Sequence, residues 1–68
     1  MRYAIVIEGE PGSYSAYVPD LPGCVTVGDT IEETRHEIQE AIRFHIEGLL
    51  EDYLPIPEPT SVVDYVEA

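Results

Sequence analysis

The sequence predicts a small α+β domain in which three strands precede one helix and a last strand follows it, in the order β-β-β-α-β. Short runs of β-branched and aromatic residues, separated by Gly- and Pro-containing turns, occupy the first half of the chain. One long segment in the second half places apolar residues at helical spacing. A chain of 68 residues has room for one core, so residues 1–68 are expected to form a single domain, a small antiparallel sheet with one helix packed on a face.

Four segments carry the features of strands. Residues 3–7 are apolar on both faces, which predicts a central strand. Apolar and polar residues alternate over residues 13–18, which predicts a half-buried strand that pairs with the first one as a hairpin. Residues 24–27 supply a third strand, and residues 61–66 are expected to supply the last one after the helix.

The helix has the clearest signals in the sequence. Thr30 and Glu33 stand in the capping-box arrangement at its start, and Pro55 prevents extension much beyond residue 52. Residues 55–59 contain three prolines and predict a stiff, extended connector. The apolar residues that recur on one stripe of this helix are Ile31, Ile38, Ala41, Ile42 and Leu49. This stripe is expected to face the sheet.

The apolar surface of the helix is wider than one sheet face requires. An arc of about 200° contains Ile42, Ile46, Leu49, Leu50 and Tyr53, and Phe44 lies outside it. Two interpretations stay open: the excess is an interface with another protein, or the last strand and the proline segment cover it. Gly48 falls on one line with Thr34 and Ala41, which favours a close contact between helix and sheet at this glycine.

The charge balance excludes several kinds of partner. Fourteen acidic and three basic side chains give a net charge of -11, which argues against direct nucleic acid binding and against adhesion to anionic membranes. No signal peptide or hydrophobic span is recognised, so a cytoplasmic location is expected. One cysteine and two histidines allow neither a disulfide nor a zinc cluster, and no cofactor is expected. A marginal core then favours stabilisation by self-association as a dimer or tetramer.

Little in the sequence supports catalysis. His45 lies near the centre of the apolar helix face and is expected to be a neutral core or interface residue. Cys24 is expected to be buried and structural. The abundant carboxylates are best explained as a solvated acidic face, so the protein is not expected to be an enzyme. A degenerate metal-dependent nuclease is a third interpretation, which predicts magnesium-stimulated RNA cleavage that is lost on Asp20→Ala substitution.

Several blocks of the sequence together resemble the HicB-like antitoxin family. They are YVPDLPGC at residues 17–24, GDTIEE at 28–33, EAI at 40–42, HIE at 45–47, ED at 51–52 and IPEP at 56–59. The resemblance implies a partial RNase-H-like fold with order β-β-β-α-β and without nuclease activity. It also implies that the protein binds a small basic mRNA-cleaving toxin, HicA, and neutralises it by covering its active site.

The sequence departs from the family pattern in two places. Where family members commonly have Gly after the acidic pair that ends the helix, this chain has Tyr53, for which a left-handed cap is costly. Complete HicB antitoxins often carry a C-terminal DNA-binding domain, whereas this sequence ends at Ala68. A short form without operator binding is therefore expected.

Two functions follow from these observations. The first is an antitoxin whose acidic charge draws it to a basic toxin and whose apolar helix surface forms the centre of the contact. The residues expected to contact the partner are Phe44, Ile46, Leu50 and Tyr53. The alternative is a solitary, self-associating regulatory or structural module that has no toxin partner.

Overall fold

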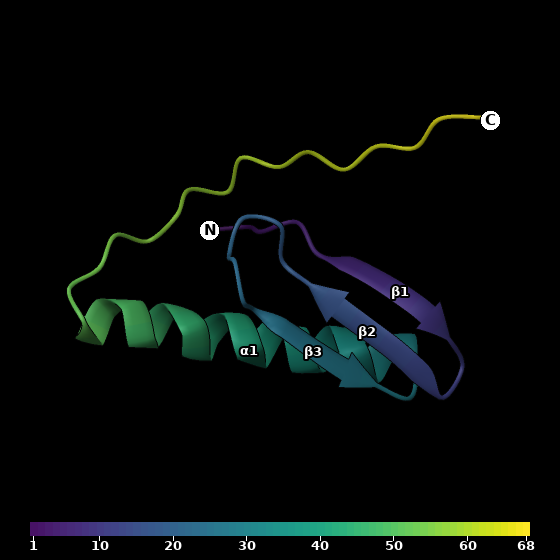
Figure 1. Cartoon of the computed structure of the whole chain (residues 1–68), viewed down its shortest axis with the longest axis horizontal. Coiled ribbons are helices and arrows are strands. Elements are labelled where there is room, and N and C mark those ends of the chain that lie inside the picture. The colour runs from purple at the N-terminus through teal and green to yellow at the C-terminus, as the bar shows by residue number, and fades with distance from the viewer.

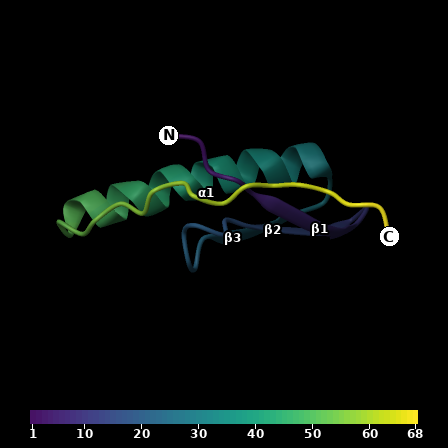
Figure 2. The same ribbon diagram turned by 90° about the horizontal axis from the view of Figure 1, so that it is seen from above.

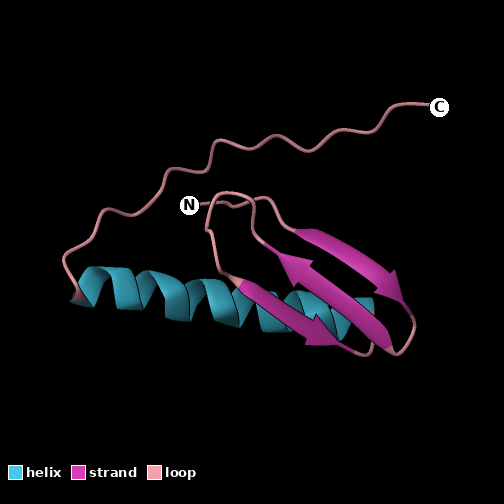
Figure 3. Cartoon of the chain, in the orientation of Figure 1, coloured by secondary structure: helices cyan, strands magenta, loops and turns pink.

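Three strands and one helix form two layers in the computed structural model, which describes residues 1–68. The strands form one antiparallel sheet in the order β1-β2-β3, and the helix lies across one face of it (Figures 1 and 2). The elements are β1 Val6–Glu10, β2 Ser13–Tyr17, β3 Val25–Gly28 and α1 Ile31–Glu51 (Figure 3). The α+β class, the three antiparallel strands and the helix that follows them confirm the prediction.

The register of the sheet decides which residues meet the helix. Ile7, Ala16 and Thr26 are opposite one another on the three strands, and Ala16 is fully buried. The neighbouring row must point to the other face, because side chains alternate along a strand. The core that forms under α1 consists of Ala16, Val18, Leu21, Cys24 and Ile38, with Tyr3, Ile5, Ile7, Ala41 and Ile42 packed against it.

The helix starts as predicted. The hydroxyl of Thr30 accepts a hydrogen bond from the backbone N–H of Glu33 at 3.0 Å, which satisfies one of the free donors of the first turn. With 21 residues α1 is about 31 Å long, whereas strands of five residues reach only about 17 Å. The C-terminal half of α1 therefore extends past the sheet, as Figure 1 shows; we call this half the helix overhang.

The helix ends in a left-handed cap despite the tyrosine at that position. Tyr53 has a φ of 56°. The N–H of Leu54 donates to the carbonyl of Leu49 at 2.9 Å, and the N–H of Tyr53 donates to the carbonyl of Leu50 at 3.2 Å. These two bonds are those of a Schellman motif, in which glycine usually takes the left-handed place.

The strand expected over residues 61–66 does not form. Residues 54–68, here called the tail, run back along the molecule without joining the sheet (Figure 1). The reason lies at the start of the expected strand, where the backbone N–H groups of Thr60 and Ser61 donate to the carboxylate of Asp20 and not to a neighbouring strand. The first strand also begins later than residue 3, although Tyr3 and Ile5 do pack against the core. It lies at an edge of the sheet, so the prediction of a central strand is wrong: β2 is the strand with a partner on both sides.

The close contact between helix and sheet occurs at a different glycine from the expected one. No atom lies within 4 Å of a Cβ built on Gly48, because this residue is on the helix overhang. At Gly28, the end of β3, a Cβ would lie 3.0 Å from the backbone nitrogen of Thr34 and 3.1 Å from its Cα. Gly28 therefore lets β3 approach the first turn of α1, where Thr34 is completely buried.

Candidate protein-interaction surface

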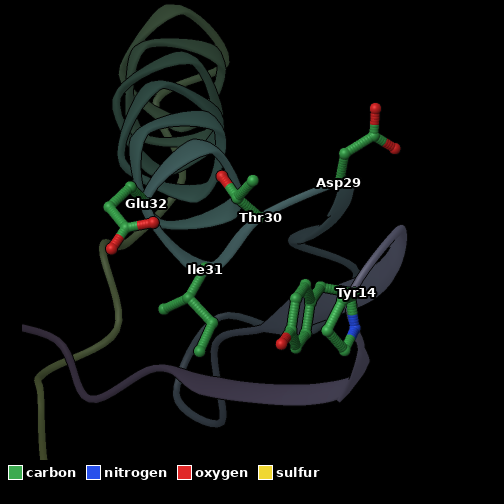
Figure 4. A pocket seen from close by; sticks show the side chains of 6 residues that line it. Tyr14, Asp29, Thr30, Ile31 and Glu32 are labelled. Carbon is green, nitrogen blue, oxygen red and sulfur yellow. The ribbon is translucent and has the colours of Figure 1, made fainter.

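The structure has three surface cavities. The one at the start of α1 has a volume of about 220 Å³, below the roughly 300–1,000 Å³ typical of small-molecule sites, whereas the other two have about 410 and 340 Å³. Figure 4 shows Tyr14 and Ile31 beside the cavity at the start of α1, with the carboxylate of Asp29 directed away from them. No group of three or more His, Cys, Asp or Glu side chains is placed to hold a metal ion. No helix combines the length and the hydrophobicity needed to cross a membrane.

Cys24 is a core residue. It belongs to the buried cluster under α1, and desolvation by burial raises the pKa of its thiol. A raised pKa keeps the sulfur protonated near neutral pH, which makes it a poor nucleophile. This agrees with the structural role expected for Cys24. His45 is half-buried on α1.

Asp20 anchors the tail. Its Oδ2 accepts hydrogen bonds from the N–H of Thr60 at 3.1 Å and of Ser61 at 2.9 Å. Its Oδ1 accepts from the hydroxyls of the same two residues, at 3.1 and 2.9 Å. These bonds hold the pKa of the Asp20 carboxyl below its ordinary value, with the N–H of Ser61 as the largest cause. Nearby, the hydroxyl of Tyr3 donates to the carbonyl of Pro57 at 2.6 Å. We call these five residues the tail anchor.

The anchor could not be found from sequence, because its partners are 40 or more positions apart. It also gives Asp20 a structural role, since both oxygens of the carboxylate are occupied by donors from the chain itself. The pKa of Tyr3 is raised, first by desolvation and then by the charges of Glu58 and Asp20.

The four residues expected to contact a partner all lie on or next to the helix overhang, but they do not share one face. Phe44 is 78 % exposed, Leu50 58 % and Tyr53 96 %, whereas Ile46 is half-buried. Ile46 and Leu50 are four positions apart and lie on the same flank of α1, and Tyr53 follows at the helix end. Phe44 precedes Ile46 by two residues, or about 200° of rotation, and so lies on the opposite flank.

A second exposed apolar surface escaped the sequence analysis. Val6, Tyr17 and Val25 are opposite one another in the register, and they point away from α1. Tyr17, Val25 and Val27 are 42 %, 65 % and 72 % exposed, whereas Val6 is half-buried. We call these four residues the outer sheet patch. The alternation of residues 24–27 was a usable signal for it, since a strand with one buried face must expose every second side chain.

The basic side chains are divided unevenly over the fold. Residues 3–34, which include the whole sheet, contain six carboxylates and no Lys, Arg or His; the carboxylates are Glu8, Glu10, Asp20, Asp29, Glu32 and Glu33. The three arginines are Arg2, Arg35 and Arg43, two of them on α1. One of these forms an exposed ion pair with its own helix, Arg43 to Glu40 at 3.7 Å. The sheet therefore carries negative charge alone, whereas α1 combines two arginines with six glutamates and is also net negative.

Comparison with known proteins assigns this chain to a family. The model of the HicB-like antitoxin of bacterial toxin–antitoxin systems matches residues 3–68. The chain belongs to the HicB-like antitoxin family. A solved structure described as the HicA3 and HicB3 toxin–antitoxin complex contains a chain with the same fold, at a TM-score of 0.75 and 32 % identity. That match covers 88 % of this chain and 70 % of the other.

Relatives of this HicB-like protein differ in length. An uncharacterised 14.9 kDa protein of Haemophilus phage HP1 is 44 % identical over 66 residues, which are 97 % of this chain and 50 % of that protein. Antitoxin HicB 1 of Photorhabdus laumondii is 39 % identical, over 98 % of this chain and 44 % of its own length. A UPF0150 protein of Synechocystis is 40 % identical, with 91 % and 80 % covered. The chain thus spans about half the length of some relatives and most of others.

Proposed function

We propose that this HicB-like protein binds a small, basic, mRNA-cleaving toxin of the HicA type and neutralises it by covering its active site. Membership of the HicB-like family is the observation that carries the proposal. The likeness to a chain of a HicA3–HicB3 complex supports the same class of partner. In this function the protein is a binding partner and not an enzyme, and it acts in the cytoplasm, where the toxin meets mRNA.

Electrostatics supports the proposal. A toxin that cuts RNA has to present basic side chains where the RNA phosphates lie. A protein of net charge -11 is attracted to that surface over distances of about one Debye length, which is roughly 10 Å at 0.1 M salt. This attraction raises the association rate more than the final affinity, so an apolar contact must hold the complex.

We propose that the helix overhang supplies this contact, through Ile46, Leu50 and Tyr53 on one flank and Phe44 on the other. The strained backbone and the exposed ring of Tyr53 support this contact. A left-handed backbone costs a non-glycine residue about 1–2 kcal/mol, and the ring of Tyr53 is too exposed to recover this cost by packing within the chain. Strained residues tend to be retained where function requires them, and a partner that buries the ring provides such a requirement.

The test is protection of RNA. Purified HicA-type toxin is mixed with an RNA substrate and a rising concentration of wild-type protein, and cleavage is expected to stop near one equivalent. Tyr53→Gly is expected to protect at least tenfold less well, although it folds at least as stably as the wild type. Tyr65→Gly, which removes another exposed tyrosine, is the matched control and is expected to protect fully.

Two outcomes of this test would contradict two different proposals. Uninhibited cleavage with wild-type protein in excess would contradict the antitoxin function. Equal protection by wild type and Tyr53→Gly would leave the function standing and remove Tyr53 from the contact.

We also propose a second candidate, self-association as a dimer or tetramer. It is favoured by Phe44, which is exposed on the flank opposite Ile46, and by a core of only five buried residues. Light scattering at micromolar concentration tests it, and a strict monomer would contradict it. Two copies of net charge -11 repel each other, so added salt is expected to strengthen self-association but to slow toxin binding.

A further inference from the structure

The outer sheet patch lies on a face that nothing in the chain covers. The helix occupies one side of the sheet, and Figure 2 shows no second layer on the other. Val6, Tyr17 and Val25 form one row across all three strands on this open face, and Val27 stands in the next outward row. A soluble domain rarely leaves a row of apolar side chains across a whole sheet face without a partner for it.

The patch continues to an open sheet edge. Beyond its ladder with β2, the backbone of β3 makes no hydrogen bond with any other segment. Proline, lysine and bulges commonly protect edge strands from pairing with other chains, and the sequence of β3, VTVG, contains neither residue. Since Val25 and Val27 lie on this edge strand, an added strand would contact the apolar patch and the free backbone groups together.

The margin of the patch is acidic. Glu8 is in the same row as Val27, with Ser15 between them, and Glu10 follows in the next outward row. No positive side chain occurs in residues 3–34, and the two arginines of α1 stand among six glutamates. An apolar centre with a charged margin is the usual composition of a protein interface, and here the margin has one sign.

From this arrangement we infer that the outer sheet patch and the free edge of β3 dock the basic surface of the toxin. The inference rests on the proposed function and adds a second contact to that of the helix overhang. A second copy of this chain is disfavoured, because it would bring Glu8 and Glu10 of two molecules toward one another. Nucleic acid is disfavoured because it too is negative. A cationic protein is the occupant whose charge complements this face.

A pair of double variants tests the inference. Val25→Lys/Val27→Lys places two positive charges at the centre of the patch, at exposed positions where a longer side chain can extend into solvent. Val62→Lys/Val66→Lys is the matched control, because it makes the same change of net charge at two exposed valines of the tail. Toxin affinity is measured by calorimetry at fixed salt, and thermal melts monitored by circular dichroism verify folding.

The sheet variant is expected to bind the toxin at least tenfold more weakly than wild type, and the tail variant within about threefold of it. If wild type binds and both variants bind equally well, the inference is wrong while the antitoxin function stands. If wild type is a dimer and the sheet variant is a monomer that binds the toxin with unchanged affinity, the patch is a contact between two copies of this chain. The inference is wrong in that case too. If wild type does not bind the toxin at all, both proposals fail.

A measurement on the unaltered protein covers the case in which the sheet variant does not fold. In ¹⁵N-labelled wild type, addition of toxin is expected to shift or broaden the amide signals of Tyr17, Val25 and Val27. Changes confined to α1 and the tail would overturn the inference without any substitution in the sheet.

Discussion

At the scale of single residues, Gly28 and Gly48 have opposite roles. Gly28 is required, because its missing Cβ allows β3 to touch the backbone of Thr34. Gly48 has open space around it and sits in the interior of α1, where glycine costs about 1 kcal/mol relative to alanine. Sequence spacing could place Gly48 on the stripe of Thr34 and Ala41, but it could not show that the sheet ends before residue 48.

Substituting each glycine by alanine is expected to change stability in opposite directions. Gly48→Ala should raise the free energy of unfolding by up to about 1 kcal/mol, since it improves helix propensity without a clash. Gly28→Ala should lower it by about 1–3 kcal/mol, because the added methyl group must displace the first turn of α1. Urea unfolding followed by circular dichroism measures both. A stable Gly28→Ala variant would contradict the close contact.

Tyr53 offers a second test at this scale. Tyr53→Gly should raise the free energy of unfolding by about 0.5–1 kcal/mol, because relief of the left-handed strain exceeds the added backbone entropy of glycine in the unfolded chain. Tyr53→Ala is the control: it removes the same exposed ring but keeps the strained φ, so it should give no such gain. Equal stability of the two variants would show that the cap is not strained.

At the scale of elements, local signals predicted the helix better than the strands. Thr30, Glu33 and Pro55 act on neighbouring backbone groups, so both ends of α1 could be read from the sequence. Residues 61–66 have the alternation of a strand, but a strand also needs a free partner, and the tail anchor uses the N–H groups of Thr60 and Ser61. The alternation of residues 24–27 likewise implied the outer sheet patch, whereas no local feature of the sequence indicates that Asp20 binds the tail.

The tail anchor predicts a pH dependence. The pKa of Asp20 is lowered in the folded protein from an ordinary value of 3.8, because the ionised carboxylate accepts four hydrogen bonds. Its contribution to stability is therefore complete above pH 3.8 and is lost as the pH falls through the lower, folded value.

Amide signals of Thr60 and Ser61, followed by NMR from pH 6 downward, are expected to titrate with a midpoint below 3.8. Asp20→Asn, which cannot ionise, is the control and should abolish this titration while leaving signals within α1 unchanged. A midpoint at or above 3.8 would contradict the assigned hydrogen bonds.

At the scale of the whole molecule, the negative charge of both layers is the feature most relevant to binding. The sheet side has carboxylates only, and the positive side chains of the structured region are on the helix. Net charge was available from composition, but its division between the two layers needed the fold. The helix is nevertheless net negative, with six glutamates beside its two arginines, so both layers attract a basic partner.

The association rate with toxin is expected to fall steeply as ionic strength rises, with a smaller change in the dissociation rate. Stopped-flow mixing at several salt concentrations measures both rates. Glu8→Gln/Glu10→Gln, at the margin of the outer sheet patch, should reduce the salt dependence more than Asp64→Asn/Glu67→Gln in the tail, which removes the same charge. Equal effects of the two pairs would argue against an approach that favours the sheet side.

The tail anchor has a further consequence for the order in which the molecule folds. Its contacts join Tyr3 to Pro57 and Asp20 to residues 60 and 61, so they span nearly the whole chain. Bringing such distant segments together costs loop-closure entropy, so we expect the anchor to form after the sheet and α1 have folded. The tail anchor is therefore the last part of the structure to form, and we expect it to open before the sheet and α1 unfold when the protein is heated or exposed to denaturant.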